Sequence, residues 1–318
     1  MTETKRVMIT ARYPDDLLAE LREVAELDVH PDPYSPRSRD EVLSKISDVH
    51  GIINQGELNV DEELLSKASQ LRVVANASVG FDKLHTGLMN SHGVWGTNVP
   101  NVYHIPVAEY VFATLGSLLR RIRPSEDYVR RGHWDSFEPG RWDGVSLHNK
   151  TIGIVGFGKA GQRVARIAEE FGMKVILNSR SRTGDERYRR LPRLAAEADV
   201  VSLHVPLKDD TYHLIDAGIL SAMKPTAYLV NVARGPVVDQ QALIEALGQN
   251  TIAGAVLDVF DGEPHVPAEF RDMPNVIVTP HIAGGTQEAR KQAQALAVAN
   301  VKAVLEGERP RTPVNDPS

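Results

Sequence analysis

The chain has 318 residues, of which 42% are hydrophobic and 25% are charged, and its formal net charge is −6 at pH 7. This composition predicts a globular protein long enough for two domains with separate cores, and it excludes a general attraction to nucleic acid or to an anionic membrane. The absence of cysteine excludes disulfides and thiolate metal sites and suits a reducing cytoplasm.

Strand and helix patterns alternate over the N-terminal third of the chain. Ser38, with Glu41 three residues later, forms the capping-box pattern of a helix start. Alternation of this kind predicts a parallel sheet covered by helices on both faces. The predicted strands are 6–10, 27–30, 51–55, 71–77 and 94–97, and the predicted helices are 15–25, a segment after Ser38 and a segment from Asp61.

Residues 105–122 form the longest apolar helical pattern. Glu109 interrupts it, so we expect a buried helix rather than a membrane span. The charged N-terminal residues lack the apolar region of a signal peptide. We therefore expect a cytoplasmic protein without a membrane partner.

A glycine-rich turn between a predicted strand and a predicted helix is the most specific local signal. Residues 151–155 predict a strand, the next residues read G-x-G-x-x-G from Gly156, and residues 162–171 have a helical pattern. In a dinucleotide-binding turn, Gly156 permits the tight turn, Gly158 lets the pyrophosphate approach bare backbone, and Gly161 lets the helix pack closely. The phosphates would lie at the helix N-terminus, where unpaired N–H groups and the dipole favour negative charge.

The residues after the next strand, 174–177, indicate which dinucleotide binds. NAD-binding proteins place an acidic residue about 20 residues after the first glycine, on the ribose 2′-hydroxyl. This chain has Ser179, Arg180 and Arg182 there. A hydroxyl and two guanidinium groups offer charge-assisted hydrogen bonds to a 2′-phosphate, which an acid would repel. The sequence predicts NADP(H); the alternative is that both arginines are solvated loop charges.

A second series of strands starts at Thr151 and describes a doubly wound domain over residues 102–286. The last predicted helix, about 287–306, has no strand after it, and we expect it to pack on the N-terminal domain. That smaller domain would comprise residues 1–101 and 287–318. The six predicted strands end at Val155, Leu177, Val205, Ala233, Val259 and Thr279.

Polar side chains occur at the ends of three successive strands of this series: Arg234, then Asp258 with Glu263, then His281. Ligands of open α/β sheets bind outside the carboxyl ends of the strands, so these side chains should share one edge with the Gly156 turn. Each alone could be a surface or turn residue. Their joint placement favours a reaction site.

Three blocks resemble the D-2-hydroxyacid dehydrogenase family: 231–236 (NVARGP), 257–264 (LDVFDGEP) and 279–286 (TPHIAGGT). Within that family the chain is most similar to NADPH-dependent glyoxylate/hydroxypyruvate reductases, through 78–83 (SVGFDK), 263–267 (EPHVP) and the pair Ser179-Arg180. The resemblance covers nearly the whole chain. It implies two doubly wound parallel-sheet domains, a Rossmann NADP-binding domain and a smaller flavodoxin-like substrate domain, with the cleft between them.

The family also implies a reaction, the reduction of a small 2-keto acid to a D-2-hydroxy acid by hydride transfer. His281 would be the general acid, and histidine suits this role because its side chain titrates near neutrality. Glu263 would orient the ring and favour its charged form. Arg234 would hold the substrate carboxylate, a task suited to a planar bidentate donor. The substrate contacts would be Gln55, Val79, Gly80, Arg234 and His281.

The resemblance implies the cofactor contacts as well. The turn from Phe157 would line the pyrophosphate, Val205 and Pro206 would contact the adenosine side, and Asp258 would bind the carboxamide. His204 is interpreted as a core or cofactor-edge residue rather than a catalyst. The expected set is Val107, Gly156, Phe157, Gly158, Lys159, Ala160, Ser179, Arg180, Arg182, His204, Val205, Pro206, Thr211, Val232, Ala233, Arg234, Asp258, His281 and Gly284.

Family members form homodimers through the segment before Thr151, where Phe137 or Trp142 could approach the partner's pocket. The remaining histidines lack H-E-x-x-H spacing, so no metal site is expected. No nucleic-acid partner is expected either.

Other interpretations stay open. The chain could instead be a formate, phosphite or phosphoglycerate dehydrogenase of the same superfamily. Formate dehydrogenases have glutamine at the position of Glu263, and the longer phosphoglycerate dehydrogenases continue beyond the position of Asn315. A different class is a nucleotide-sensing corepressor scaffold, which the compact ends disfavour. The preference among glyoxylate, hydroxypyruvate and 2-ketogluconate, and the strictness for NADPH over NADH, do not follow from the sequence.

Overall fold

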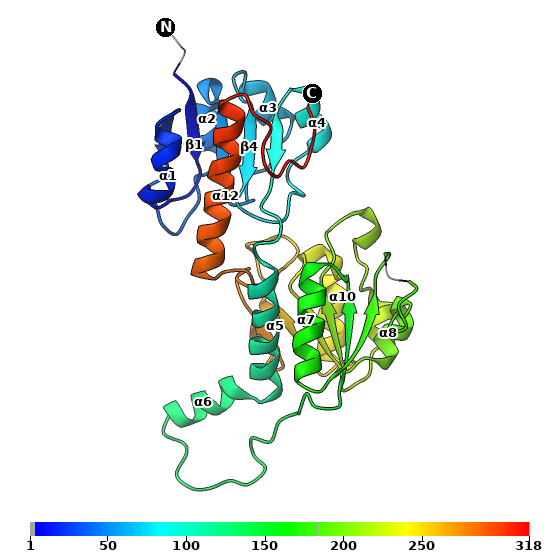
Figure 1. The fold of residues 1–318 in the computed structure, drawn as a ribbon. Coiled ribbons are helices and arrows are strands. Elements are labelled where there is room, and N and C mark those ends of the chain that lie inside the picture. Colours follow the sequence, from blue (N-terminus) through cyan, green and yellow to red (C-terminus); the bar gives the residue numbers. More distant parts are fainter. Residues whose placement is uncertain (1–3, 182, 318) are drawn as a thin grey trace. The chain divides into compact units, whose positions relative to one another are not determined.

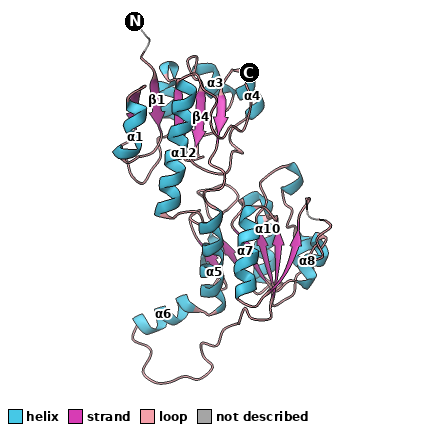
Figure 2. Ribbon diagram, in the orientation of Figure 1, coloured by secondary structure: helices cyan, strands magenta, loops and turns pink. Residues whose placement is uncertain are grey.

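We describe a computed structural model of the chain, in which residues 4–181 and 183–317 are described. The chain divides into two compact units, one of Met1–Tyr103 with Thr286–Ser318 and one of His104–Gly285. Each unit is a parallel sheet between layers of helices (Figures 1 and 2). The prediction of two parallel-sheet α/β domains is confirmed.

The first unit contains a five-stranded sheet in the order β2-β1-β3-β4-β5, the flavodoxin-like strand order. Neighbouring strands are parallel, and Val7 pairs with Gly51 between β1 and β3. The strands are β1 Arg6–Ile9, β2 Glu26–Val29, β3 Gly51–Asn54, β4 Val73–Asn76 and β5 Trp95–Thr97, and the helices are α1 Asp15–Arg22, α2 Arg39–Lys45, α3 Glu62–Lys67, α4 Thr86–Ser91 and α12 Gln287–Leu305.

The final helix, α12, packs against α1, β3 and β4, so the first unit is built from both ends of the chain (Figure 1). Its Ala293, Ala297 and Val301 are buried together with Val7 and Ile9 of β1. Met8, between those two β1 residues, is buried in the cluster on the opposite face of the sheet. This alternation explains why the strands of a sheet covered on both faces are continuously apolar.

The second unit contains a six-stranded sheet in the order β11-β10-β9-β8-β6-β7. The chain reverses its winding direction at β6, which lies between β7 and β8, and this is the switch point where doubly wound sheets bind ligands. The strands are β6 Thr151–Val155, β7 Lys174–Asn178, β8 Val200–Leu203, β9 Tyr228–Asn231, β10 Gly254–Leu257 and β11 Val276–Val278, and the helices are α5 His104–Leu119, α6 Ile122–Arg130, α7 Lys159–Glu170, α8 Leu191–Glu197, α9 Ala217–Ala222, α10 Gln240–Gly248 and α11 Ala268–Asp272.

Several boundaries differ from the predicted ones. The long helix predicted to reach Ile122 ends at Leu119, Arg121 adopts a left-handed φ of 53°, and α6 starts a new direction. Pro124 supplies the reason, because proline has no N–H and clashes with the preceding turn inside a helix but is accepted in a first turn. Helix α7 starts at Lys159, earlier than the expected Gln162. Ser38 is confirmed as the N-cap, since its hydroxyl accepts the Glu41 N–H, but the Glu41 carboxylate contacts Arg37 and Lys45 instead of completing the capping box.

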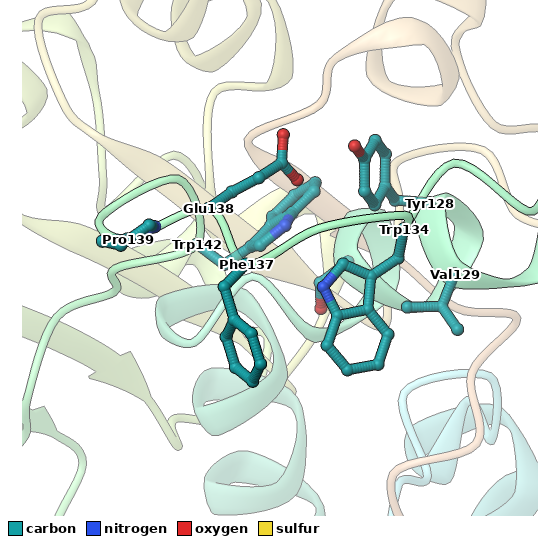
Figure 3. A pocket seen from close by; sticks show the side chains of 8 residues that line it. Tyr128, Val129, Trp134, Phe137, Glu138, Pro139 and Trp142 are labelled. Carbon is teal, nitrogen blue, oxygen red and sulfur yellow. The ribbon is translucent and has the colours of Figure 1, made fainter.

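The segment between α6 and β6 carries an aromatic cluster, which we call the arm. Side chains of the arm and of α6 together surround a hollow of about 280 Å³ (Figure 3). Trp142 packs against Tyr128, with the ring centroids 5.3 Å apart, and the Arg121 guanidinium lies over the Trp142 ring. Phe137, by contrast, is 90% exposed. The lining residues are Ser125, Tyr128, Val129, Trp134, Phe137, Glu138, Pro139 and Trp142.

Among the helices of the described ranges, none is long and apolar enough to cross a membrane.

Candidate functional site

The turn after β6 has the geometry that its glycines predict. Gly156 has a φ of 94°, and a Cβ there would lie 2.5 Å from the His204 carbonyl oxygen. A Cβ on Gly161 would lie 2.2 Å from the Gly156 carbonyl oxygen, whereas one on Gly158 would meet no atom within 4 Å. The first and third glycines are therefore required by close packing, and the second faces open space.

Helix α7 begins at this turn, with Gly158 as its N-cap residue. A glycine cannot cap the first-turn N–H groups with a side chain, so within the described residues they keep their donor capacity for a ligand. Gln162 donates to the Phe157 carbonyl oxygen at 3.0 Å, and the Arg187 guanidinium lies over the Phe157 ring. Lys159 is exposed and Ala160 is partly buried at the helix start. These groups fit a pyrophosphate.

The β7 end carries Ser179 and Arg180. Arg180 Nη1 lies 2.5 Å from Asp210 Oδ2, and both side chains are mostly exposed. Ser179 Oγ lies 3.3 Å from Ser181 Oγ. Arg182 lies outside the described residues. The strand end thus presents hydroxyl groups and at least one guanidinium, which suits a phosphate ester.

The β8 end contributes side chains that point into the protein. His204 Nε2 lies 2.9 Å from Ser202 Oγ, and burial lowers the pKa of His204 to about 4. A histidine that stays neutral in this way suits the structural role expected for it. The Thr211 hydroxyl is also turned inward, because it donates to the Pro206 carbonyl oxygen and accepts the Lys208 N–H. Thr211 therefore shapes the loop beside Val205 and Pro206.

Asp258, just past β10, organises the loop that follows β11. Its side chain is 1% exposed, and its two carboxylate oxygens accept hydrogen bonds from Thr279 Oγ1 at 2.6 Å, Ile282 N at 2.8 Å and Ala283 N at 2.7 Å. Burial raises the pKa of Asp258, and these hydrogen bonds oppose the rise. Asp258 thus holds both ends of the loop that carries His281.

Tyr110 of α5 extends this network. Its hydroxyl contacts Thr279 Oγ1, and burial raises the pKa of Tyr110 to about 12. Since Thr279 donates its proton to Asp258, its oxygen must accept from Tyr110. A chain of hydrogen bonds therefore runs from α5 to the His281 loop. Val107, one turn earlier on α5, is partly buried.

His281 and Glu263 form the central pair of the site. His281 Nδ1 lies 2.8 Å from Glu263 Oε2, and Glu263 Oε1 accepts the Phe260 N–H at 3.0 Å. His281 has a φ of 55°, a left-handed conformation that costs a non-glycine residue on the order of 1 kcal/mol. Its N–H is held by the carbonyl oxygens of Asp258 and Thr279. The surrounding network compensates for this strain, and the contact with Glu263 occupies Nδ1 of the ring.

The charge of Glu263 is maintained by its surroundings. Burial raises the pKa of Glu263, but the His281 hydrogen bond and charge, the Phe260 N–H and the nearby Arg234 together outweigh it, so the pKa of Glu263 is lowered overall. The carboxylate is therefore ionised through the neutral range.

Arg234 follows β9 and approaches the same loop. Its carbonyl oxygen accepts from Asn231 Nδ2 at 3.0 Å, and its Nη1 donates to the Ala233 carbonyl oxygen at 2.8 Å. A Cβ on the next residue, Gly235, would lie 1.9 Å from the Phe260 carbonyl carbon. This backbone contact brings the β9 and β10 loops together and explains why the Arg234 charge acts on Glu263.

The remaining predicted cofactor residues lie on these same loops. Ala233 is buried and its N–H is held by Asn231 Oδ1 at 3.1 Å. Val232, before it, and Gly284, after the Asp258-anchored amides, are partly buried. Apart from Val107 on α5, the described residues predicted for cofactor and catalysis in the second unit thus follow the carboxyl ends of strands β6 to β11, at one edge of the sheet.

The substrate residues predicted in the first unit lie beyond β3 and β4. Gln55 Nε2 donates to the Tyr13 hydroxyl at 3.0 Å, and the Gln55 N–H is held by Glu57. The carbonyl oxygens of Val79 and Gly80 accept from Asn98 and Ser78 respectively. In the described part of the chain, no protein acceptor takes the Val79 or Gly80 N–H. This loop therefore presents two backbone donors, as an anion-binding loop requires.

Comparison with known proteins agrees with this geometry. Residues 112–283 match the family described as D-isomer specific 2-hydroxyacid dehydrogenase, NAD binding domain. A glyoxylate reductase from Thermococcus litoralis is 38% identical over 321 residues, which cover 98% of this chain and 96% of the relative.

Solved structures match over the same extent. A Thermus thermophilus protein, 37% identical, has a TM-score of 0.91 and covers 97% of this chain and 99% of its own. An NADPH-dependent glyoxylate/hydroxypyruvate reductase from Sinorhizobium meliloti, in complex with NADP and malonate, is 31% identical, has a TM-score of 0.86 and covers 98% of this chain and 97% of its own.

A doubly wound sheet with a dinucleotide turn and a histidine-carboxylate pair at the same edge is typical of nicotinamide-dependent oxidoreductases. The chain belongs to the D-isomer specific 2-hydroxyacid dehydrogenase family. The resemblance seen in the sequence is thereby confirmed, and so is the reaction class, the reduction of keto acids with a nicotinamide cofactor.

Three residues that shape the site were missed by sequence reasoning. Tyr110 lies in an apolar helix pattern that gives no indication of a polar role, and Asp210 lies in a loop far from its partner Arg180 in sequence. Gly235 did carry a signal, since a glycine directly after a strand-end arginine suggests close backbone approach.

Proposed function

We propose that this protein reduces small 2-keto acids, with glyoxylate and hydroxypyruvate as the leading substrates and 2-ketogluconate as a further one, to D-2-hydroxy acids with NADPH. The observation that carries this proposal is the 2.8 Å contact of His281 with Glu263 at the sheet edge that also carries the Gly156 turn. The glyoxylate reductase names of the relatives support the substrate class.

The residues would divide the reaction between them. The bound cofactor supplies the hydride for the carbonyl carbon. His281 would donate the Nε2 proton to the carbonyl oxygen, because its Nδ1 faces Glu263. Glu263 would stabilise the charged ring before the transfer. Arg234 would bind the substrate carboxylate. Gln55 and the amides of Val79 and Gly80 are proposed as further substrate contacts.

Analysis of the product tests the reaction. With hydroxypyruvate and NADPH, we expect stoichiometric glycerate of the D configuration, measured by chiral chromatography. L-glycerate, or consumption of NADPH without glycerate, would refute the proposed stereochemistry or the substrate assignment.

Glu263→Gln tests the pairing with His281. The neutral amide keeps a hydrogen-bond acceptor but loses the charge that favours the protonated ring, so reductive turnover should fall, and its decline with rising pH should begin at lower pH than in the wild type. A pH profile of kcat/KM measures this. An unchanged profile would separate Glu263 from the proton transfer. Glu269→Gln, an exposed carboxylate on α11, serves as the control.

The preference for NADP(H) is part of the proposal. Its support is the hydroxyl and guanidinium groups after β7, where an acidic residue would favour NAD. The Sinorhizobium meliloti protein, whose structure contains NADP, supports it as well.

Arg180→Asp combined with Arg182→Ala should weaken NADPH binding by about 10²-fold and leave NADH binding nearly unchanged, because charge-assisted bonds to a phosphate are lost and an acid is gained. Fluorescence titration with each reduced cofactor measures the two affinities. Arg193→Ala is the matched control, since Arg193 is 70% exposed against 71% for Arg180 and also has one close acidic partner. An equal loss of affinity for NADPH and NADH would show that these arginines do not recognise the 2′-phosphate.

A cytoplasmic homodimer completes the proposal. The exposed rings of Trp134 and Phe137 on the arm support a self-association surface, because large aromatic side chains are enriched in the cores of interfaces. Phe137 is the better candidate for reaching the partner's pocket, since Trp142 is packed within the arm (Figure 3). Light scattering on the purified protein should give twice the 35.0 kDa chain mass.

A further inference from the structure

The ion pair between Arg180 and Asp210 lies across the dinucleotide edge. Arg180 follows β7 and Asp210 follows β8, and these strands flank β6, whose end carries the Gly156 turn. The pair therefore connects the loops on either side of the strand at which the dinucleotide turn begins. A 2′-phosphate bound by Arg180 would have to share or displace the Asp210 carboxylate.

The two partners differ in how firmly they are held. Asp210 lies in the short 3-10 helix Asp209–Thr211, which is fixed by the buried Thr211 hydroxyl through bonds to Pro206 and Lys208. Arg180 is a long side chain that is 71% exposed. When a phosphate competes for the guanidinium, Arg180 can turn towards it while Asp210 stays in place as a nearby negative charge.

We propose that Asp210 is a specificity-determining residue that competes with the cofactor's 2′-phosphate for Arg180 and so restrains the preference for NADPH over NADH. The inference rests on the proposed NADP(H) specificity. A phosphate gains the Arg180 interaction only after the existing ion pair is lost, and it then lies near an uncompensated carboxylate. An unphosphorylated ribose neither breaks the ion pair nor places a negative charge beside Asp210.

The test uses equilibrium binding of adenosine 2′,5′-bisphosphate and adenosine 5′-phosphate to the whole protein, measured by calorimetry at fixed ionic strength. Asp210→Asn should tighten the bisphosphate by roughly fivefold, the sum of a lost exposed ion pair and a lost screened repulsion, with less than a twofold change for the monophosphate. Asp209→Asn is the matched control, because it removes one negative charge from the same 3-10 helix without touching the Arg180 pair, and it should change the bisphosphate affinity by less than twofold.

An Arg180→Ala background separates competition from general charge. In the Arg180→Ala background, Asp210→Asn should increase the affinity for the bisphosphate only about twofold, because no guanidinium is left to be released from an ion pair. If Asp210→Asn increased the bisphosphate affinity fivefold in that background as well, or if Asp209→Asn increased it equally, the effect would come from net charge alone. Either result would overturn the proposal. Weaker bisphosphate binding by Asp210→Asn would also overturn it, since Asp210 would then position Arg180 for the phosphate.

The same data separate this inference from the proposed function. If the wild type binds the bisphosphate no more tightly than the monophosphate, the NADP(H) assignment itself fails. If the wild type prefers the bisphosphate but Asp210→Asn leaves that preference unchanged, only the role of Asp210 fails.

Discussion

His281→Ala should reduce kcat for 2-keto acid reduction by about 10²- to 10⁴-fold, which is the contribution of a positioned general acid. The structure supplies the reason, since Glu263 holds Nδ1 at 2.8 Å and so fixes the direction of the other ring nitrogen. NADPH affinity should change little, because the dinucleotide turn and the β7 end belong to separate loops of the same sheet edge.

Steady-state rates and fluorescence titration of NADPH measure the two quantities separately. His265→Ala is the control, since His265 is an exposed histidine two residues after Glu263, and it should keep kcat within about twofold. Near-normal turnover of the His281 variant would show that another group delivers the proton. A parallel loss of NADPH binding would point to collapse of the Asp258-anchored loop instead.

Arg234→Lys should lower kcat/KM by about 10²-fold although the charge is kept, because a single ammonium cannot reproduce a planar bidentate contact with a carboxylate. Folding should be retained, since the neighbouring backbone contact at Gly235 is unaltered. Much of the loss should appear in KM, which reports the substrate carboxylate.

Inhibition by a simple carboxylate tests this role of Arg234 more sharply than the reaction rate alone. If Arg234 binds the carboxylate, inhibition by propionate, which has a carboxylate but no keto group, should weaken in parallel with KM. Unchanged inhibition by propionate together with a lower kcat would place Arg234 on the carbonyl rather than the carboxylate.

The sequence was informative where backbone geometry depends on residue type. Gly156 and Gly161 are required by contacts that exclude a Cβ, so the dinucleotide turn could be predicted from the motif together with the strand and helix patterns on either side of it. The same holds for Arg234, Glu263 and His281, because parallel strands bring their carboxyl ends to one edge. Most strand ends were predicted one or two residues too late, since apolar patterning continues into the buried loops, whereas the ends of β5 and β6 were predicted correctly and that of β7 one residue too early.

What escaped prediction depends on contacts between distant segments. The bonds of Asp258 to the loop amides after β11 give it a structural role beside the predicted carboxamide contact, and no local pattern reveals this. Tyr110 joins that network only because α5 packs on the sheet above Thr279. The break before α6, in contrast, could have been found from Pro124.

The most direct test of the proposed function is the loss of near-ultraviolet absorbance of the reduced cofactor with glyoxylate, hydroxypyruvate, pyruvate and 2-ketogluconate, each with NADPH and with NADH. Glyoxylate or hydroxypyruvate with NADPH should give the highest kcat/KM, and NADH should be the weaker cofactor with every acid. Binding of NADPH without turnover of any of these acids would contradict the account and favour a nucleotide-sensing scaffold.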